Sequence, residues 1–105
     1  MICKHLAAVA LVAAAGFSFP AWPQAAGSNL GRNLAASCAN CHGTNGSSTG
    51  GIPSLAGQPS QVLMRALMEF REGKRPASIM HQLSKGYSAE QLELIAAFFA
   101  TQKAR

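Results

Sequence analysis

The stretch Cys38-Ala39-Asn40-Cys41-His42 decides the fold of this chain. Its spacing is C-x-x-C-H, the pattern by which a c-type haem is attached to protein. The two thiols are close enough along the chain to bond both vinyl groups on one edge of a haem. The histidine that follows can reach the iron with a ring nitrogen. The motif therefore predicts one covalently bound haem c, anchored by Cys38 and Cys41 and ligated by His42.

Other uses of these cysteines fit the sequence less well. A structural zinc site needs about four protein ligands, whereas the motif supplies three and no second C-x-x-C or H-x-x-x-H follows it. A thioredoxin-like redox pair follows a strand within a larger α/β domain, and no strand pattern precedes Cys38. We expect thioether bonds to use both thiols, which leaves none for a disulfide.

Residues 1–26 have the features of a secretion signal, with an approximate cleavage site at Ala25-Ala26-Gly27. Lys4 and His5 precede an alanine-rich apolar run over residues 6–19. That run is shorter than the ~20 residues that a membrane span needs, although retention as an uncleaved anchor is the alternative. We expect a periplasmic protein without a stable membrane span, built as one domain over residues 27–105.

The charge balance is basic, with nine Lys or Arg against four acidic residues. Lys4 belongs to the predicted signal, so eight basic residues remain in the domain. They form no dense run, and we therefore expect no nucleic-acid binding. A basic rim could steer the protein to an acidic redox partner, and ordinary solubility charge is the alternative. Arg71, Lys74, Arg75 and Lys85 are the candidates for such steering.

The pattern along the domain predicts short helices between glycine-rich loops. Ser28 or Asn29 is expected to cap a first helix that runs to about Cys38. A loop over residues 43–52 follows, and Pro59 suits the first turn of a second, longer helix. Apolar residues then repeat at helical spacing until Gly73, which favours a helix end.

In the remaining third of the domain, the sequence pattern predicts a short apolar segment and a final helix. The segment over residues 77–83 ends near Gly86, and Ser88 then begins a capping box completed by Gln91. No alternating strand pattern occurs. We therefore expect an all-α fold with its helices wrapped around one haem, which also completes the core of so small a domain.

The sixth position on the iron has four candidate ligands: Met64, Met68, Met80 and His81. Met64 and Met68 lie within the periodic second helix, where methionine commonly fills core gaps. Met80 comes after the break at residues 74–76, so it can approach from the side opposite His42. Adjacent residues point in different directions, and only one of Met80 and His81 can serve. We predict Met80, with a bis-histidine site through His81 as the alternative.

Ligation by histidine and methionine raises the reduction potential of a haem. It also fills both axial positions, so no site is left at the iron for oxygen or peroxide. This favours electron transfer and not catalysis, and we expect no enzymatic activity from the chain alone. An open sixth position would instead favour a haem sensor or ligand-binding module.

The sequence Pro53-Ser54-Leu55-Ala56-Gly57, at its distance from His42, resembles class I cytochromes c. The resemblance implies the small class I cytochrome c fold, in which first and last helices pack together. It also implies that the carbonyl of Pro53 accepts a hydrogen bond from His42, and that Leu55 packs on the haem. Such an acceptor fixes the imidazole and strengthens it as a donor. Packing of the terminal helices would join these residues: Gly31, Leu34, Ile95, Phe98 and Phe99.

Residues 78–88 carry a narrower resemblance. This stretch includes Ile79-Met80 and Lys85-Gly86-Tyr87-Ser88. This stretch is similar to the cytochrome subunit of flavocytochrome c sulfide dehydrogenase, and residues 53–58 resemble the cytochrome c4 group. The resemblance implies that Met80 binds iron and that the partner is a flavoprotein that oxidises sulfide. Well-known members have two haem domains, whereas this chain has one C-x-x-C-H and resembles a single-haem version.

Two roles follow from that resemblance. The first is the electron-accepting subunit of a sulfide-oxidising flavoprotein, which would cover the haem edge near Ala39 and Asn40. The second is a free c4- or c5-like carrier that serves an oxidase or another dehydrogenase. Tyr87 is expected either near the haem or the partner surface, or as a core aromatic residue.

Overall fold

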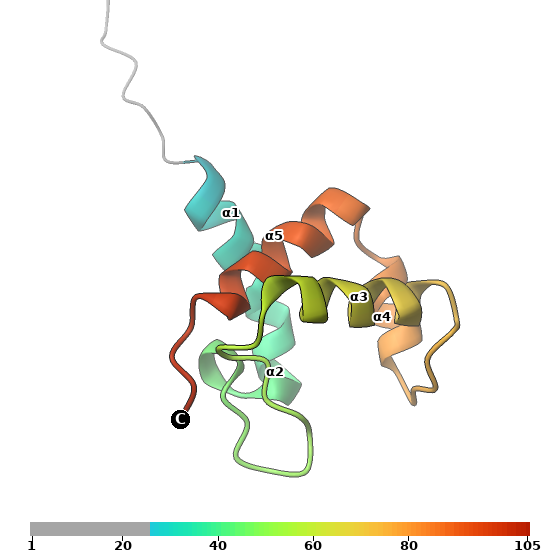
Figure 1. The fold of residues 1–105 in the computed structure, drawn as a ribbon, viewed down its shortest axis with the longest axis horizontal. Coiled ribbons are helices and arrows are strands. Elements are labelled where there is room, and N and C mark those ends of the chain that lie inside the picture. The colour runs from blue at the N-terminus through green and yellow to red at the C-terminus, as the bar shows by residue number, and fades with distance from the viewer. Residues whose placement is uncertain (1–25) are drawn as a thin grey trace, which may run out of the picture.

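The computed structural model describes residues 26–105, with side chains from Asn29 onward. This part of the chain is helical and contains no strand, which confirms the all-α prediction. Its elements are α1 (Ala26–Ala35), η1 (Ala36–Cys38), α2 (Ala39–His42), η2 (Thr44–Gly46), α3 (Ser60–Arg71), α4 (Met80–Lys85) and α5 (Ala89–Ala100) (Figure 1). The predicted secretion signal lies almost wholly outside the described residues. No helix within them has the length and apolar character to cross a bilayer.

The first helical segment is longer than predicted at both ends. Helix α1 already includes Ala26, so the expected cap at Ser28 or Asn29 is wrong; alanine is the best helix former, and the helix extends through those polar residues. After α1 the chain continues through η1 and α2 in helical conformation and stops at Gly43, which has φ of 86°. The C-x-x-C-H motif therefore lies on the last turns of one nearly continuous helical segment.

Helix α3 begins and ends with backbone caps. Pro59 directly precedes the helix, not within its first turn as predicted, and its carbonyl accepts hydrogen bonds from the N–H groups of Val62 and Leu63 at 3.0 and 3.1 Å. At the other end Gly73 has φ of 73° and donates to the Phe70 carbonyl at 3.1 Å. The next N–H, of Lys74, donates to Glu69 at 2.8 Å, which completes a Schellman motif. The predicted stop at Gly73 is confirmed.

A capping box separates the two C-terminal helices and begins the second of them. Helix α4 begins at Met80 and ends at Lys85, so only the second half of the predicted apolar segment is helical. The Ser88 hydroxyl accepts from the N–H of Gln91 at 3.2 Å, and the Gln91 side chain accepts from the N–H of Ser88 at 2.9 Å. The predicted capping box is thus confirmed and fixes the start of α5.

The core forms where α5 packs against α1 and against α3 (Figure 1). Its buried members come from these three helices: Ala35, Leu63, Leu92, Ile95, Ala96 and Phe99. Leu34 and Phe98 pack against them while partly buried. The predicted packing of the first helix on the last is therefore confirmed. Helix α4 packs mainly against α3, at the side of the molecule farthest from the C-terminus (Figure 1).

Candidate haem site

The motif residues differ in their accessibility. Cys38 is half-buried against the core and Cys41 is exposed, and both thiols are free of disulfide bonds. His42 is buried, with 9% of its surface exposed. Burial raises the pKa of the Cys38 thiol, while a hydrogen bond to Ser37 partly opposes that effect. A buried imidazole next to reachable thiols is the arrangement that attachment at a haem edge requires.

The ring of His42 is held by the loop that follows α2. Its Nδ1 lies 2.6 Å from the carbonyl oxygen of Pro53. A carbonyl can only accept, so Nδ1 carries the proton and donates. The other ring nitrogen, Nε2, is then left with a lone pair that can bind a metal. The hydrogen bond implied by the family resemblance is therefore present.

Glycine geometry fixes the loop that carries Pro53. The carbonyl of Gly46 accepts from the N–H groups of Leu55 and Ala56, at 2.7 and 3.1 Å. Gly46 itself has φ of 80°, and a Cβ there would lie 2.7 Å from the ring of Phe99. Farther along, the N–H of Gly57 donates to the Phe99 carbonyl at 3.0 Å. These contacts hold both ends of the Pro53 segment against the core. They thereby also fix the orientation of His42, which is hydrogen-bonded to Pro53.

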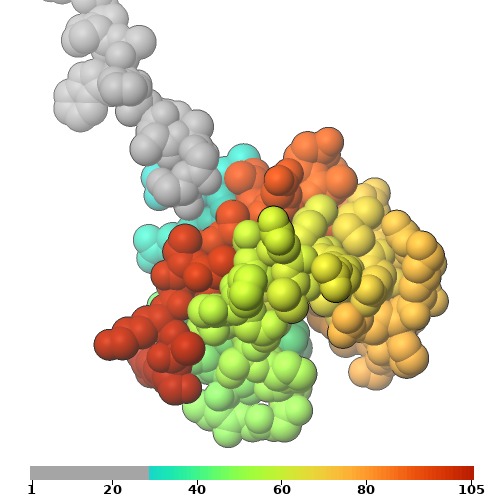
Figure 2. Space-filling model, in the orientation of Figure 1, coloured from blue at the N-terminus to red at the C-terminus, as the bar shows by residue number. Residues whose placement is uncertain are grey.

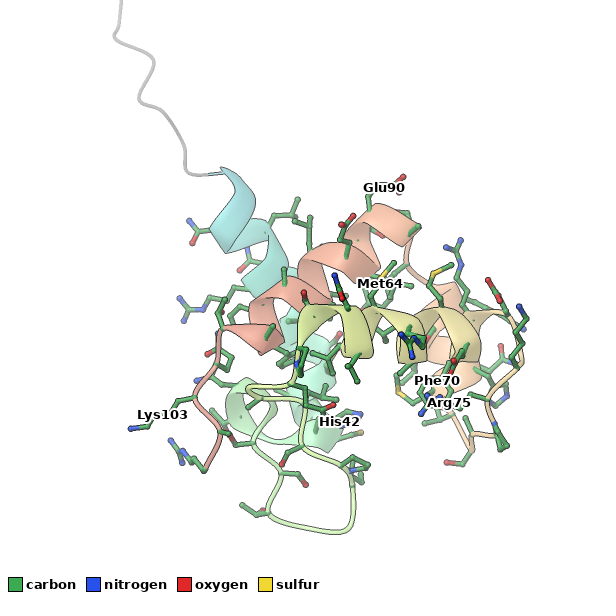
Figure 3. The ribbon with its side chains drawn as sticks, viewed as in Figure 1. His42, Met64, Phe70, Arg75, Glu90 and Lys103 are labelled. Carbon is green, nitrogen blue, oxygen red and sulfur yellow. The ribbon has the colours of Figure 1, made fainter. Side chains whose placement is uncertain are left out.

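The candidate sixth ligands lie in different surroundings. Met64 and Met68 pack against the core cluster, and Met64 lies on the opposite side of α3 from His42 (Figure 3). Met80 is the first residue of α4 and is only half-buried. His81 has its Nδ1 buried without a hydrogen-bond partner. Of these three methionines, Met80 is the one that does not pack against the core cluster.

The surface is hollowed between the segments that carry His42 and Met80. Figure 2 shows this hollow below α3, between the green loop after α2 and the orange region of α4. Apolar side chains on both of those segments are about half exposed: Ile52 at 43%, Ile79 at 50% and Leu83 at 48%. Leu55 lies on the same loop as Pro53 and packs partly against the core.

The donor set fits a haem c and not a simple metal ion. Two thiols, one imidazole with a free Nε2 and one thioether match two covalent anchors and two axial ligands. Among the described residues, no three His, Cys, Asp or Glu side chains cluster closely enough to hold a metal ion by themselves. The residues therefore suit an iron that is carried by a macrocycle.

A helical shell with this donor set defines a c-type haem protein. The chain belongs to the cytochrome c family, whose model matches residues 28–103. Its cofactor is haem c. The chain is 42% identical over 69 residues to the cytochrome subunit of sulfide dehydrogenase from Chlorobaculum tepidum, a match that covers 66% of this chain and 63% of that protein.

Other relatives and a solved structure agree with this family. Cytochrome c4 of Pseudomonas aeruginosa is 39% identical over 70% of this chain and 37% of its own length. Cytochrome c-554(548) of Halomonas halodenitrificans is 32% identical, and the match covers 70% of this chain and 93% of that protein. The structure of Acidithiobacillus ferrooxidans cytochrome c4 superposes with a TM-score of 0.68 at 28% identity, over 72% of this chain and half of the other. The fold is thus the class I cytochrome c fold.

Two groups of polar residues near the site were not predicted from the sequence. Ser37 Oγ and Tyr87 OH are 2.8 Å apart, although the Tyr87 ring also packs against the core. On α4, the Ser84 hydroxyl is buried without a partner, as is Nδ1 of His81. The sequence had singled out His81 as a candidate ligand and Tyr87 within the Lys85-Gly86-Tyr87-Ser88 element, but not these hydrogen-bonding states. Ser37 and Ser84 follow no pattern that would single them out.

Proposed function

We propose that this chain is a periplasmic cytochrome with one haem that accepts electrons from a sulfide-oxidising flavoprotein. The 42% identity to the cytochrome subunit of a sulfide dehydrogenase carries the proposal. The matched region spans less than two thirds of that relative. In this proposal the chain serves as a redox subunit that oxidises no substrate itself, and residues 1–26 direct its export.

The chain's own residues have distinct roles in holding the cofactor. Cys38 and Cys41 anchor the haem edge, and His42 and Met80 are the axial ligands. Pro53 fixes the tautomer and orientation of His42 through its carbonyl, and Leu55 contacts the ring. The bound haem supplies a reversible one-electron change at iron. If His42 and Met80 both ligate the iron, no position is left there for a small molecule, and the residues favour passing electrons on.

The basic side chains differ in whether an acidic neighbour pairs with them. Lys74 pairs with Glu72 at 2.7 Å and Arg75 pairs with Glu69 at 2.7 Å. These ion pairs reduce the steering that the sequence suggested for Lys74 and Arg75. Arg32 forms no ion pair within the described residues, and neither do Arg71 and Lys85, the other two candidates for steering. We infer that Arg32 contributes more to partner attraction than the region after α3 does.

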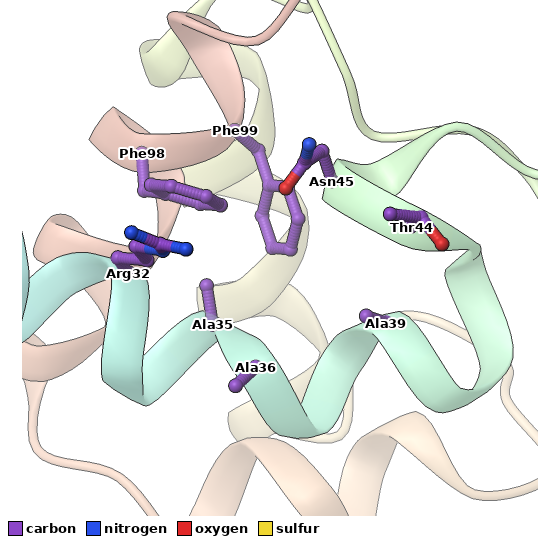
Figure 4. Close-up of a pocket in the computed structure, with 8 residues that line it drawn as sticks. All are labelled: Arg32, Ala35, Ala36, Ala39, Thr44, Asn45, Phe98 and Phe99. Atoms are coloured by element: carbon purple, nitrogen blue, oxygen red, sulfur yellow. The ribbon is translucent and has the colours of Figure 1, made fainter.

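The surroundings of Arg32 suit an acidic partner near the haem edge. Arg32 lies beside Phe98 at a cavity of about 210 Å³ (Figure 4). Ala39 forms part of this cavity and of a second hollow that Asn40 and Cys41 also line. No carboxylate is among the residues that line either space. A partner held at Arg32 would therefore contact the peptide between the two haem-anchoring cysteines.

The proposal is tested with the haem-loaded protein and a purified sulfide-oxidising flavoprotein. Sulfide alone should reduce the cytochrome slowly, and the flavoprotein should increase that rate by orders of magnitude. Arg32→Gln should lower the second-order rate at low salt and flatten its dependence on salt. Arg75→Gln combined with Glu69→Gln, which removes an ion pair without changing the net charge, is the matched control. Equal rates with and without the flavoprotein would exclude this role.

A free electron carrier is the second candidate. The match to cytochrome c-554(548), which covers 93% of that protein, favours it, because the relative is close to this domain in length. A carrier should purify from native cells without flavin and should accept electrons from a different dehydrogenase. A thiosulfate dehydrogenase electron acceptor of Thiomonas intermedia, 38% identical over 71 residues, names another donor class to assay.

A further inference from the structure

We propose that the hydrogen bond between Ser37 and Tyr87 is a positioning contact that holds the Met80 segment closed over the haem. Its two oxygens are 2.8 Å apart, and either hydroxyl can donate. The inference rests on the proposed ligation by Met80, but not on any particular electron donor. It assigns Ser37 and Tyr87 a role through Met80 and not through direct contact with iron.

The position of each residue supports this role. Ser37 belongs to η1 and directly precedes Cys38, so it is fixed to the segment that binds one haem edge. Tyr87 lies between Gly86, which caps the end of α4, and Ser88, which caps the start of α5. The two residues are 50 positions apart, whereas the His42–Pro53 bond spans 11. The bond thus connects the segment that carries Cys38 with the end of α4, the helix that begins at Met80.

Helix α4 packs on α3, but few of its own apolar side chains contribute to that contact. It has six residues and no side-chain cap at its N-terminus, where Met80 lies. Ile79 and Leu83 are about half exposed, so this helix buries little apolar surface of its own. Two polar atoms on its inner side, of His81 and Ser84, have no hydrogen-bond partner. Short helices with few buried contacts open locally at low cost.

The expected size of the effect is modest. A hydrogen bond contributes about 0.5–1.5 kcal/mol net, which corresponds to a roughly two- to tenfold change in an equilibrium. Ser37 is exposed, so water competes for its hydroxyl and the lower part of that range applies. Loss of the bond should increase the population in which Met80 is displaced by about two- to fivefold.

The test uses oxidised, haem-loaded protein and imidazole as a competing ligand. Imidazole displaces methionine sulfur, and the loss of the weak sulfur-to-iron absorption band reports its binding. Tyr87→Phe and Ser37→Ala should each tighten apparent imidazole binding about two- to fivefold. The double variant should match the single ones, because both remove the same bond. Ser37→Thr, which keeps a hydroxyl, should retain wild-type affinity.

A control separates positioning from general loss of stability. Thr101→Val removes another exposed hydroxyl, which donates to the Phe98 carbonyl at 2.7 Å on the far end of α5. It should lower the denaturation midpoint without changing imidazole affinity. Wild-type imidazole affinity in Tyr87→Phe, or additive effects in the double variant, would overturn the proposal.

Hydrogen exchange gives a second readout that needs no iron ligand. Amide protons of α4 should exchange faster in Tyr87→Phe and Ser37→Ala than in the wild type, while those of α3 should not. If the wild type lacks the sulfur band, Met80 ligation fails, yet α4 exchange still reports on the Ser37–Tyr87 bond. Unchanged exchange in both variants would refute the positioning role independently.

Discussion

Gly31 of α1 lies directly against the backbone carbonyl of Leu94 in α5. A Cβ at position 31 would be 2.8 Å from that oxygen, closer than real Cβ atoms come. The obstacle is backbone, which cannot rotate away as a side chain can. This contact lets the two helices cross closely and positions Phe99 under the loop that holds Pro53.

Substitution of Gly31 tests how tightly the helices pack. Alanine would gain up to about 1 kcal/mol from helix propensity, but the displaced backbone should cost about 1–3 kcal/mol. We expect Gly31→Ala to lower the free energy of unfolding by about 1 kcal/mol in denaturant titrations of the haem-loaded protein. Gly50→Ala is the control, because a Cβ there meets nothing within 4 Å. A more stable Gly31→Ala variant would contradict the close packing.

The same substitution should have opposite effects at two serines. Ser84→Ala removes a buried hydroxyl that has no partner, so stability should stay equal or increase by up to about 1 kcal/mol. Ser88→Ala removes the cap of α5 and should lower stability by about 1 kcal/mol. Thermal unfolding of the two variants and the wild type measures the sign of each change in stability. Clear destabilisation by Ser84→Ala would mean that its hydroxyl has a partner in solution.

Loss of Met80 should change the iron site and leave the fold in place. Met80→Ala should abolish the sulfur-to-iron absorption band and lower the reduction potential. Met64→Leu replaces a methionine that packs against the core, so it should keep both properties. Absorption spectra and potentiometric titration make the comparison. Persistence of the band in Met80→Ala would transfer the assignment to another methionine.

Removal of both anchors should affect folding as well as haem attachment. The wild-type protein should retain its haem through acid-acetone extraction, with a mass one haem above that of the polypeptide. Cys38→Ser combined with Cys41→Ser should yield a polypeptide without covalent haem that is largely unfolded by circular dichroism, because so small a domain has little core without it. Haem that extracts freely from the wild type would exclude thioether attachment.

Local signals predicted the parts of the fold that depend on local physics. The box of Ser88 and Gln91 and the stop at Gly73 involve residues a few positions apart, so their sequence pattern determines their geometry. The start of α1 was mispredicted because Ser28 competes with the high helix propensity of the neighbouring alanines. The Ser37–Tyr87 bond could not be predicted, since it depends on how two distant segments pack.

The site divides in a similar way. The spacing of Cys38, Cys41 and His42 defines haem attachment without any tertiary information. The acceptor for His42 came only from a family resemblance, and the structure now shows the bond. The unpartnered atoms of His81 and Ser84 have no counterpart in the sequence pattern, because burial of a polar atom depends on the packing of α4 on α3.

The acceptor for His42 is a main-chain oxygen, which has a consequence for how this protein can evolve. Every residue type carries the same carbonyl, so a substitution at position 53 does not delete the acceptor; it changes only how firmly that oxygen is held. Substitution of Gly46, where a Cβ would lie 2.7 Å from Phe99, would move that oxygen, as would insertions or deletions between residues 43 and 53. Most single substitutions should therefore leave the donor strength of the His42 imidazole unchanged. Heritable changes in the potential should instead arise through loop length and through the opposite axial side.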